Sequence, residues 1–165
     1  MTPLSTMAEL RKVDPETTDP AALRVAVALP PGVAIRAQDV RLLITLEATR
    51  DAPELNQPIA LARMPLGTEE DALVQALHPG HSLHAFRIRA SDLDVFRAVR
   101  KAAIRADRDG GLSVDADPCR PAGATTHGGY LTVYLNAEET SRYVSMFGDM
   151  SLDAGDLADL PTCPS

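Results

Sequence analysis

The sequence has few of the residues that usually build large cores or cross membranes. It contains no tryptophan, three tyrosines and three phenylalanines among 165 residues, so aromatic side chains make up only 4%. A core of this composition must be packed mainly from alanine, leucine and valine. No apolar run approaches the roughly 20 residues that a membrane-spanning helix requires, so none is predicted.

Basic residues are outnumbered by acidic ones. The formal net charge is −7 and the sequence pI is about 5.0, which argues against nucleic acid and anionic lipid as partners. One concentration of positive charge lies at helical spacing opposite an apolar stripe, a pattern typical of a solvated helix face. It comprises Arg97, Arg100, Lys101, Arg105 and Arg108.

Catalytic and cofactor motifs are absent. No Gly-x-Ser-x-Gly sequence occurs, and the glycine pairs at 110–111 and 128–129 precede expected strands rather than the helix that a phosphate-binding loop needs. The sequence around Cys119 gives no consistent signal for a reactive thiol, because Arg120 would lower the pKa of the thiol and nearby aspartates would raise it. We therefore predict no catalytic residue and no cofactor.

Cysteine occurs only twice, at Cys119 and Cys163, and the second lies in an acidic, proline-rich tail. We predict a disulfide between them, which would restrict the unfolded chain by roughly 4 kcal/mol in the chain-entropy model. A disulfide implies an oxidising compartment. No signal peptide opens the sequence, so export requires a leader ahead of Met1. The alternative is a cytoplasmic protein with two reduced thiols.

The length suits one domain, and short alternating segments predict its architecture. We expect an α+β fold, mainly an antiparallel β-sheet or β-sandwich of six to seven strands with one long helix, about 92–107, packed on it. The alternative is a split-βαβ sheet with helices at 68–77 and 92–107 on one face. The expected strands are 23–29, 40–46, 59–64, 83–89, 112–116, 130–135 and 143–146.

Local signals suggest where these elements begin and end. We predict an irregular leader or tether over 1–18, a globular domain over 19–165 and a loop-like tail after Met150. Prolines at both ends of 59–64 favour an edge strand. Thr68 and Ser91, each followed by acidic residues, are the expected helix caps.

Three histidines, His78, His81 and His84, are spaced by three residues, and His127 lies elsewhere. Imidazole clusters can bind zinc or copper, so the three form a metal candidate. However, Pro79 and Gly80 would interrupt any helix that aligned the first two histidines, and His84 falls in an expected strand. We predict exposed turn histidines and no metal.

Aspartates provide two further candidates for chemistry. Asp115 and Asp117 would share one face of a strand, whereas Asp92 and Asp94 would diverge on a helix. The segment 107–115 resembles part of a calcium-binding EF-hand loop but lacks acceptable residues at the two end positions. We interpret these aspartates as caps and solubilising residues rather than catalysts.

Several segments together resemble small uncharacterised lipoproteins of alphaproteobacterial envelopes. They are 2–7, 10–15, 110–114, 119–120 and 134–135. The resemblance implies a lipidated cysteine directly before Thr2 in the precursor and a tether from membrane to domain. It also implies a periplasmic or outer-membrane-anchored location, but no catalytic or ligand residues.

Two functions follow as predictions. The first is a non-catalytic cell-envelope protein that binds an envelope protein partner through an exposed strand edge or loop. The second is a small enzyme or a metal- or ligand-binding protein in which His81, His84, Asp115 and Asp117 converge on one pocket.

Overall fold

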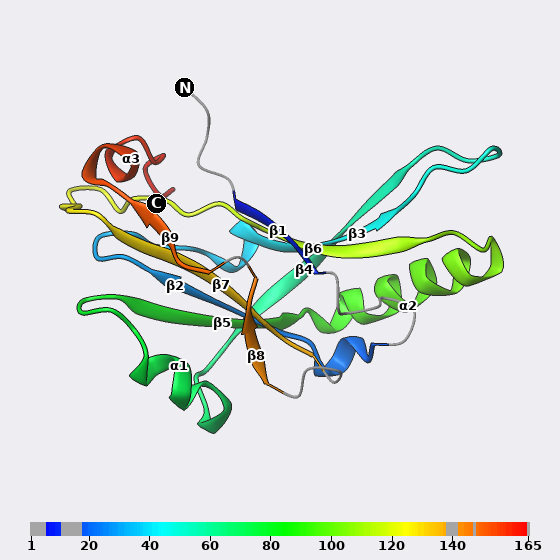
Figure 1. Cartoon of the computed structure of the whole chain (residues 1–165), viewed down its shortest axis with the longest axis horizontal. Coiled ribbons are helices and arrows are strands. Elements are labelled where there is room, and N and C mark those ends of the chain that lie inside the picture. Colours follow the sequence, from blue (N-terminus) through cyan, green and yellow to red (C-terminus); the bar gives the residue numbers. More distant parts are fainter. Residues whose placement is uncertain (1–5, 11–17, 138–141, 147, 165) are drawn as a thin grey trace.

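The fold is a curled antiparallel sheet with one long helix packed on it (Figure 1). The computed structural model describes residues 6–10, 18–137, 142–146 and 148–164. Three helices are present in this part of the chain: α1 (Asp71–Gln75), α2 (Ala90–Arg105) and α3 (Ala154–Ala158). Its strands are β1 (Thr6–Leu10), β2 (Arg24–Leu29), β3 (Val40–Leu46), β4 (Leu55–Met64), β5 (Ser82–Ile88), β6 (Gly110–Ala116), β7 (Gly129–Asn136), β8 (Tyr143–Ser145) and β9 (Met150–Leu152).

The strand order is β1-β6-β3-β4-β5-β2-β7-β8, where β8 pairs with residues 134–136 of β7 and β9 pairs with residues 129–131 of the same strand. Every ladder between these strands is antiparallel. The predicted α+β class and long helix are therefore confirmed. The sheet is continuous and curls into a half-barrel, so the sandwich and split-βαβ alternatives do not apply.

β4 is a corner strand and not the edge strand that we predicted for 59–64. Residues 55–60 pair with β3, and residues 61–64 pair with β5. At the corner, the backbone N–H of Ala60 donates to Asp92, while its carbonyl accepts from the N–H of Arg89. Strand geometry repeats every two residues, so the nitrogen of Pro58 also points away from β3. This explains how a proline fits inside the sheet.

The main core lies on the face of the sheet against which α2 packs. Alternate residues of β3 are buried there, and α2 adds Phe96 and Ala103. On the opposite side, a smaller cluster forms where Leu73 and Leu77 cover Ala26 and its neighbours on β2 and β5. β2 is therefore buried on both faces, which fits its continuous run of small apolar residues.

Both predicted helix caps are wrong. The side chain of Ser91 caps nothing, because α2 begins at Ala90 and the carboxylate of Asp92 instead binds β4. At the other helix, Glu70 rather than Thr68 accepts from the backbone, namely from the N–H of Gly67 at 2.8 Å. The basic residues of α2 are only partly solvated, since Arg100 donates to the carbonyl of Thr18.

The two chain ends are more ordered than the sequence suggested. The tail after Met150 contains β9 and α3, and it buries Leu152, Leu157 and Leu160 in the core. At the N-terminal end, residues 6–10 form β1 beside β6 instead of irregular chain. The other leader residues up to position 17 lie outside the described residues, so the predicted tether is not addressed. Within the described part, no helix is long and apolar enough to cross a membrane.

Candidate functional site

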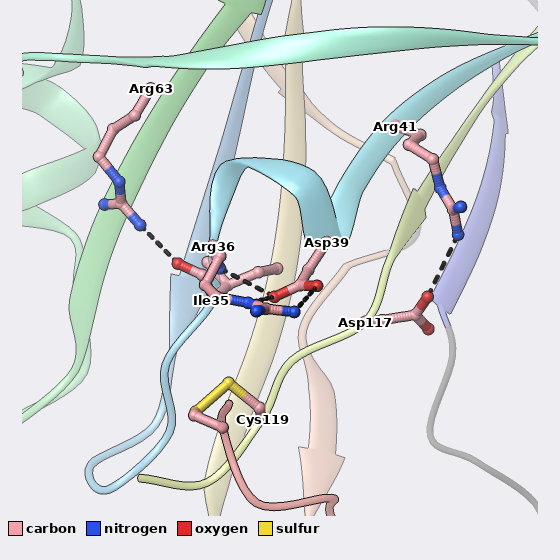
Figure 2. Close-up of polar contacts among 8 residues, drawn as sticks. Ile35, Arg36, Asp39, Arg41, Arg63, Asp117 and Cys119 are labelled. Atoms are coloured by element: carbon pink, nitrogen blue, oxygen red, sulfur yellow. Dashed lines mark hydrogen bonds and ion pairs between the residues drawn. A yellow bond between two sulfur atoms is a disulfide. The ribbon is translucent and has the colours of Figure 1, made fainter. Parts of the chain in front are cut away.

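The segment between β2 and β3, residues 30–39, runs across the sheet because these two strands are not neighbours. We call it the crossover. Ala34 forms a two-way backbone bridge with Cys119, with both N–H groups donating at 2.8 Å. Cys119 in turn forms the predicted disulfide with Cys163, at a Cα–Cα distance of 4.9 Å (Figure 2). The disulfide therefore joins the C-terminal tail to the strand end that holds the crossover.

A second contact closes the crossover on itself. The guanidinium of Arg36 donates to both carboxylate oxygens of Asp39, at 2.7 and 2.8 Å, around the 3₁₀ turn η2 (Ala37–Asp39). These side-chain hydrogen bonds from Arg36 lower the pKa of Asp39, although partial burial acts in the opposite direction. The carbonyl of Asp39 also accepts from the N–H of Asp117 at 2.8 Å.

A third contact, made by Arg63 of β4, ties the crossover to the body of the sheet. One nitrogen of its guanidinium donates to the carbonyl of Ile35, and another donates to Nδ1 of His84 at 2.7 Å (Figure 2 shows the first). The guanidinium also lies over the ring of Phe86, 5.3 Å from its centroid. Arg63 thus connects β4, β5 and the crossover.

A cleft of about 580 Å³ opens where β4 turns from β3 to β5. Its walls come from η2, the start of β3, the middle of β4 and the start of α2. It is lined by the apolar residues Ala37, Val40, Pro58, Ala60 and Leu61 and by the polar residues Gln38, Arg41, Arg89 and Asp92.

Two of the three charged groups in this cleft are already engaged. Arg41 donates to Asp115 at 2.9 Å and to Asp117 at 3.4 Å, and Asp92 accepts from Ala60 at 2.7 Å. The exposed guanidinium of Arg89 makes no hydrogen bond or ion pair with any described residue. Within the described part of the chain, the cleft therefore presents an unpaired cation beside a small apolar surface.

His78 and His81 lie away from the cleft, beside Tyr130 at the start of β7. Nε2 of His78 is 2.9 Å from a carboxylate oxygen of Asp149, and its ring stacks on Tyr130 at 4.3 Å. Nε2 of His81 accepts from the N–H of Tyr130 at 3.0 Å. Hydrogen bonds from Thr132 and then from His78 lower the pKa of Asp149.

His84 lies apart from His78 and His81 and contacts Arg63 instead. Its Nε2 lies 2.8 Å from the hydroxyl of Ser82, which has the appearance of a catalytic dyad. A guanidinium can only donate, so Nδ1 of His84 must accept and the ring proton must sit on Nε2. His84 then donates to Ser82 and cannot take a proton from it.

The predicted site residues therefore fall into three separate places. His81 lies beside Tyr130, His84 beside Arg63, and Asp115 with Asp117 beside Arg41. No group of three or more His, Cys, Asp or Glu side chains within the described ranges could hold a metal ion. Outside these places, Asp94 pairs loosely with Arg97 at 3.7 Å.

Sequence reasoning missed Arg63, Arg89 and Asp149. Each acts at a distance along the chain: Arg63 reaches a residue 28 positions away, and Asp149 one 71 positions away. Arg89 was the last residue of an expected strand, and nothing in the sequence showed that Ala60 of β4 would lie beside it.

Comparisons with known proteins give no relative for this chain. No protein-family model matches it, and no curated protein or solved structure does.

Proposed function

We propose that this protein is a non-catalytic binding domain of an oxidising, extracytoplasmic compartment, and that it binds a segment of a partner protein in the corner cleft. The observation that carries the proposal is the cleft itself, in which the guanidinium of Arg89 has no partner among the described residues and lies next to an apolar floor. The resemblance to envelope lipoproteins adds a cell-envelope location, periplasmic or anchored to the outer membrane.

The cleft chemistry indicates what the partner segment must carry. Arginine presents planar donors that match a carboxylate in a bidentate contact. Pro58 and Ala60 next to it offer room for a small apolar side chain. The segment therefore carries an acidic side chain, or a chain-terminal carboxylate, beside such a residue. Because the whole chain is acidic, recognition depends on this local contact and not on long-range attraction.

The arrangement of the other polar residues supports a binding role over the enzymatic alternative. That alternative needs His81, His84, Asp115 and Asp117 on one pocket, and they occupy three places. Each of them is also held in an internal contact: the two histidines through hydrogen bonds and Asp115 and Asp117 through Arg41. These contacts are suited to holding segments of the fold together.

The disulfide supports the proposed compartment. Disulfides persist in secreted and periplasmic proteins and are rare where thiols are kept reduced. Here the bond between Cys119 and Cys163 fastens a tail whose helix α3 has only five residues. This attachment of the tail lasts only in a compartment that keeps the disulfide oxidised.

Photo-cross-linking in an envelope extract of the source organism tests the binding proposal. The photoreactive group is placed at Gln38, on the rim of the cleft, and three versions are compared: the otherwise unchanged chain, Arg89→Glu and Arg87→Glu. Arg87 is the matched control, since it is an exposed arginine on β5 whose guanidinium makes no hydrogen bond or ion pair with any described residue. We expect a defined adduct that Arg89→Glu reduces at least about ten-fold, as for a charge-reversed contact, and that Arg87→Glu preserves. Equal adduct yields from both variants would refute the cleft as the binding site.

A further inference from the structure

The contact between His84 and Arg63 supports one wall of the cleft. It requires that the His84 ring is neutral. Arg63 fixes the carbonyl of Ile35, and the crossover continues directly into Ala37 and Gln38, which line the cleft. Val33 and Ile35 of the crossover pack in the core, and its other hydrogen bonds among the described residues run to itself or to the strand end at Asp117 and Cys119. Among the described residues, Arg63 thus supplies the side-chain hydrogen bond that joins the crossover to β4.

Protonation of His84 is incompatible with this contact. Nδ1 of the ring accepts from Arg63 at 2.7 Å, so a proton placed there would set two donors and two positive charges against each other. The ring is half-buried, which limits screening by water. The hydroxyl of Ser82 accepts from Nε2 of the ring. It can do so whether the ring is neutral or protonated, so this contact does not oppose protonation of His84.

The described residues around the ring include no group that would compensate for the added charge. On β2, the residue paired with His84 is Val27, and the same face of β5 continues into Phe86. From β4, the guanidinium of Arg63 faces the ring; from β5 itself, the hydroxyl of Ser82 does. Among the described residues, Arg63 is the charged group that acts on the ring, and it is a cation.

We propose that His84 and Arg63 form a pH-sensitive clasp on the crossover, which holds the wall of the corner cleft at neutral pH and releases it in acid. As a control of ligand access, this rests on the binding site proposed above. Burial first, and the charge of Arg63 second, lower the pKa of His84. The clasp is therefore complete above the ordinary pKa of histidine and is lost as the pH falls through the lowered value.

Amide hydrogen exchange of the free protein tests the clasp. The reporters are the amides of Ala34, Asp117 and Cys119, which are hydrogen-bonded along the crossover. Each rate is divided by the intrinsic rate at the same pH, and protection is compared between about pH 8 and about pH 5, a range that spans histidine titration. We expect protection to fall about ten-fold in the unchanged chain, as for loss of a hydrogen bond to a charged group.

Three variants make the result specific. His84→Gln keeps an acceptor for Arg63 but does not titrate, so its protection should stay nearly constant with pH. Arg63→Gln removes the clasp and should show low protection at both pH values. His127→Gln, at an exposed histidine, should retain the full pH response.

Two outcomes would overturn the proposal: no loss of protection in acid beyond the intrinsic change, or the same loss in His84→Gln as in the unchanged chain. Since Asp39 has a lowered pKa, its ion pair with Arg36 persists at about pH 5 and does not confuse the measurement. The exchange experiment needs no partner, so its outcome is independent of the Arg89→Glu comparison. Failure of one is therefore distinguishable from failure of the other.

Discussion

Two histidines only six positions apart, His78 and His84, stand in opposite electrostatic settings. His78 is exposed and faces the carboxylate of Asp149, whereas His84 is half-buried and faces the guanidinium of Arg63. A carboxylate partner tolerates both the neutral and the protonated ring, but a guanidinium partner tolerates only the neutral one. The comparison shows that the partner, and not the histidine, decides how a contact responds to acid.

The two contacts also hold different segments. His84 acts through Arg63 on the crossover, which the disulfide secures from the other side through Cys119. His78 acts on Asp149, in the short connection between β8 and β9, and both of these strands pair with β7. The predictions below separate these two regions.

The largest effect is expected from removing the disulfide, which supports the His84 region directly. Cys119→Ala combined with Cys163→Ala should lower the free energy of unfolding by about 2 to 4 kcal/mol, because the unfolded chain is no longer restricted. The folded tail should remain in place through Leu157 and Leu160, which are buried. Urea denaturation checks the loss, and amide exchange should rise at Ala34 more than at Tyr130.

A control for this prediction is chemical reduction of the unchanged protein, which should reproduce the stability of the double variant. A change below about 0.5 kcal/mol in both experiments would contradict it, since this is the usual range of surface substitutions.

A smaller effect is expected from the pH dependence that His84 introduces. Its pKa is lowered in the folded protein, so the unfolded chain binds more protons as the pH falls below the ordinary histidine value. Stability should therefore decrease from about pH 7 to about pH 5 by about 1 kcal/mol, a hydrogen-bond contribution reduced by partial exposure. In His84→Gln this decrease should be largely absent. The measurement is the free energy of unfolding from urea denaturation at each pH.

The same experiment on Asp149→Asn supplies the contrast. That variant should keep the decrease between about pH 7 and about pH 5, because it leaves His84 and Arg63 unchanged. A flattened profile in Asp149→Asn would mean that the two histidine regions are not independent.

The sequence predicts the fold better than the site, for a physical reason. Along β2, β3 and β7, a valine, leucine or isoleucine at every second position is a local pattern that reports which side chains face the main core. By contrast, β9 and α3 lie in an acidic tail whose few leucines matter only because they reach the core. No local pattern could show that contact.

The site depends on contacts in space that spacing along the chain does not report. His78, His81 and His84 look like one cluster in the sequence, but the turn at Pro79 and the strand after it separate the third from the first two. Similarly, Ser91 resembles a helix cap, yet Asp92 binds the backbone of Ala60, 32 residues earlier. The corner of β4 creates both the cleft and this contact, and only the folded sheet reveals it.

The smallest effect is expected at the His78 region. Asp149 accepts from Thr132 and faces His78, and these hydrogen bonds lower the pKa of its carboxyl group. The contribution of Asp149 to stability is therefore present above the ordinary carboxyl pKa and is lost as the pH falls through the lowered value. At neutral pH, Asp149→Asn should cost less than about 1 kcal/mol, because the carboxylate is largely exposed and screened. Asn keeps an acceptor for Thr132, so the loss reports mainly on His78. Urea denaturation of Asp149→Asn, His78→Gln and the double variant measures this coupling: a double variant no worse than either single one supports a direct contact, whereas additive losses would show that the two residues act separately.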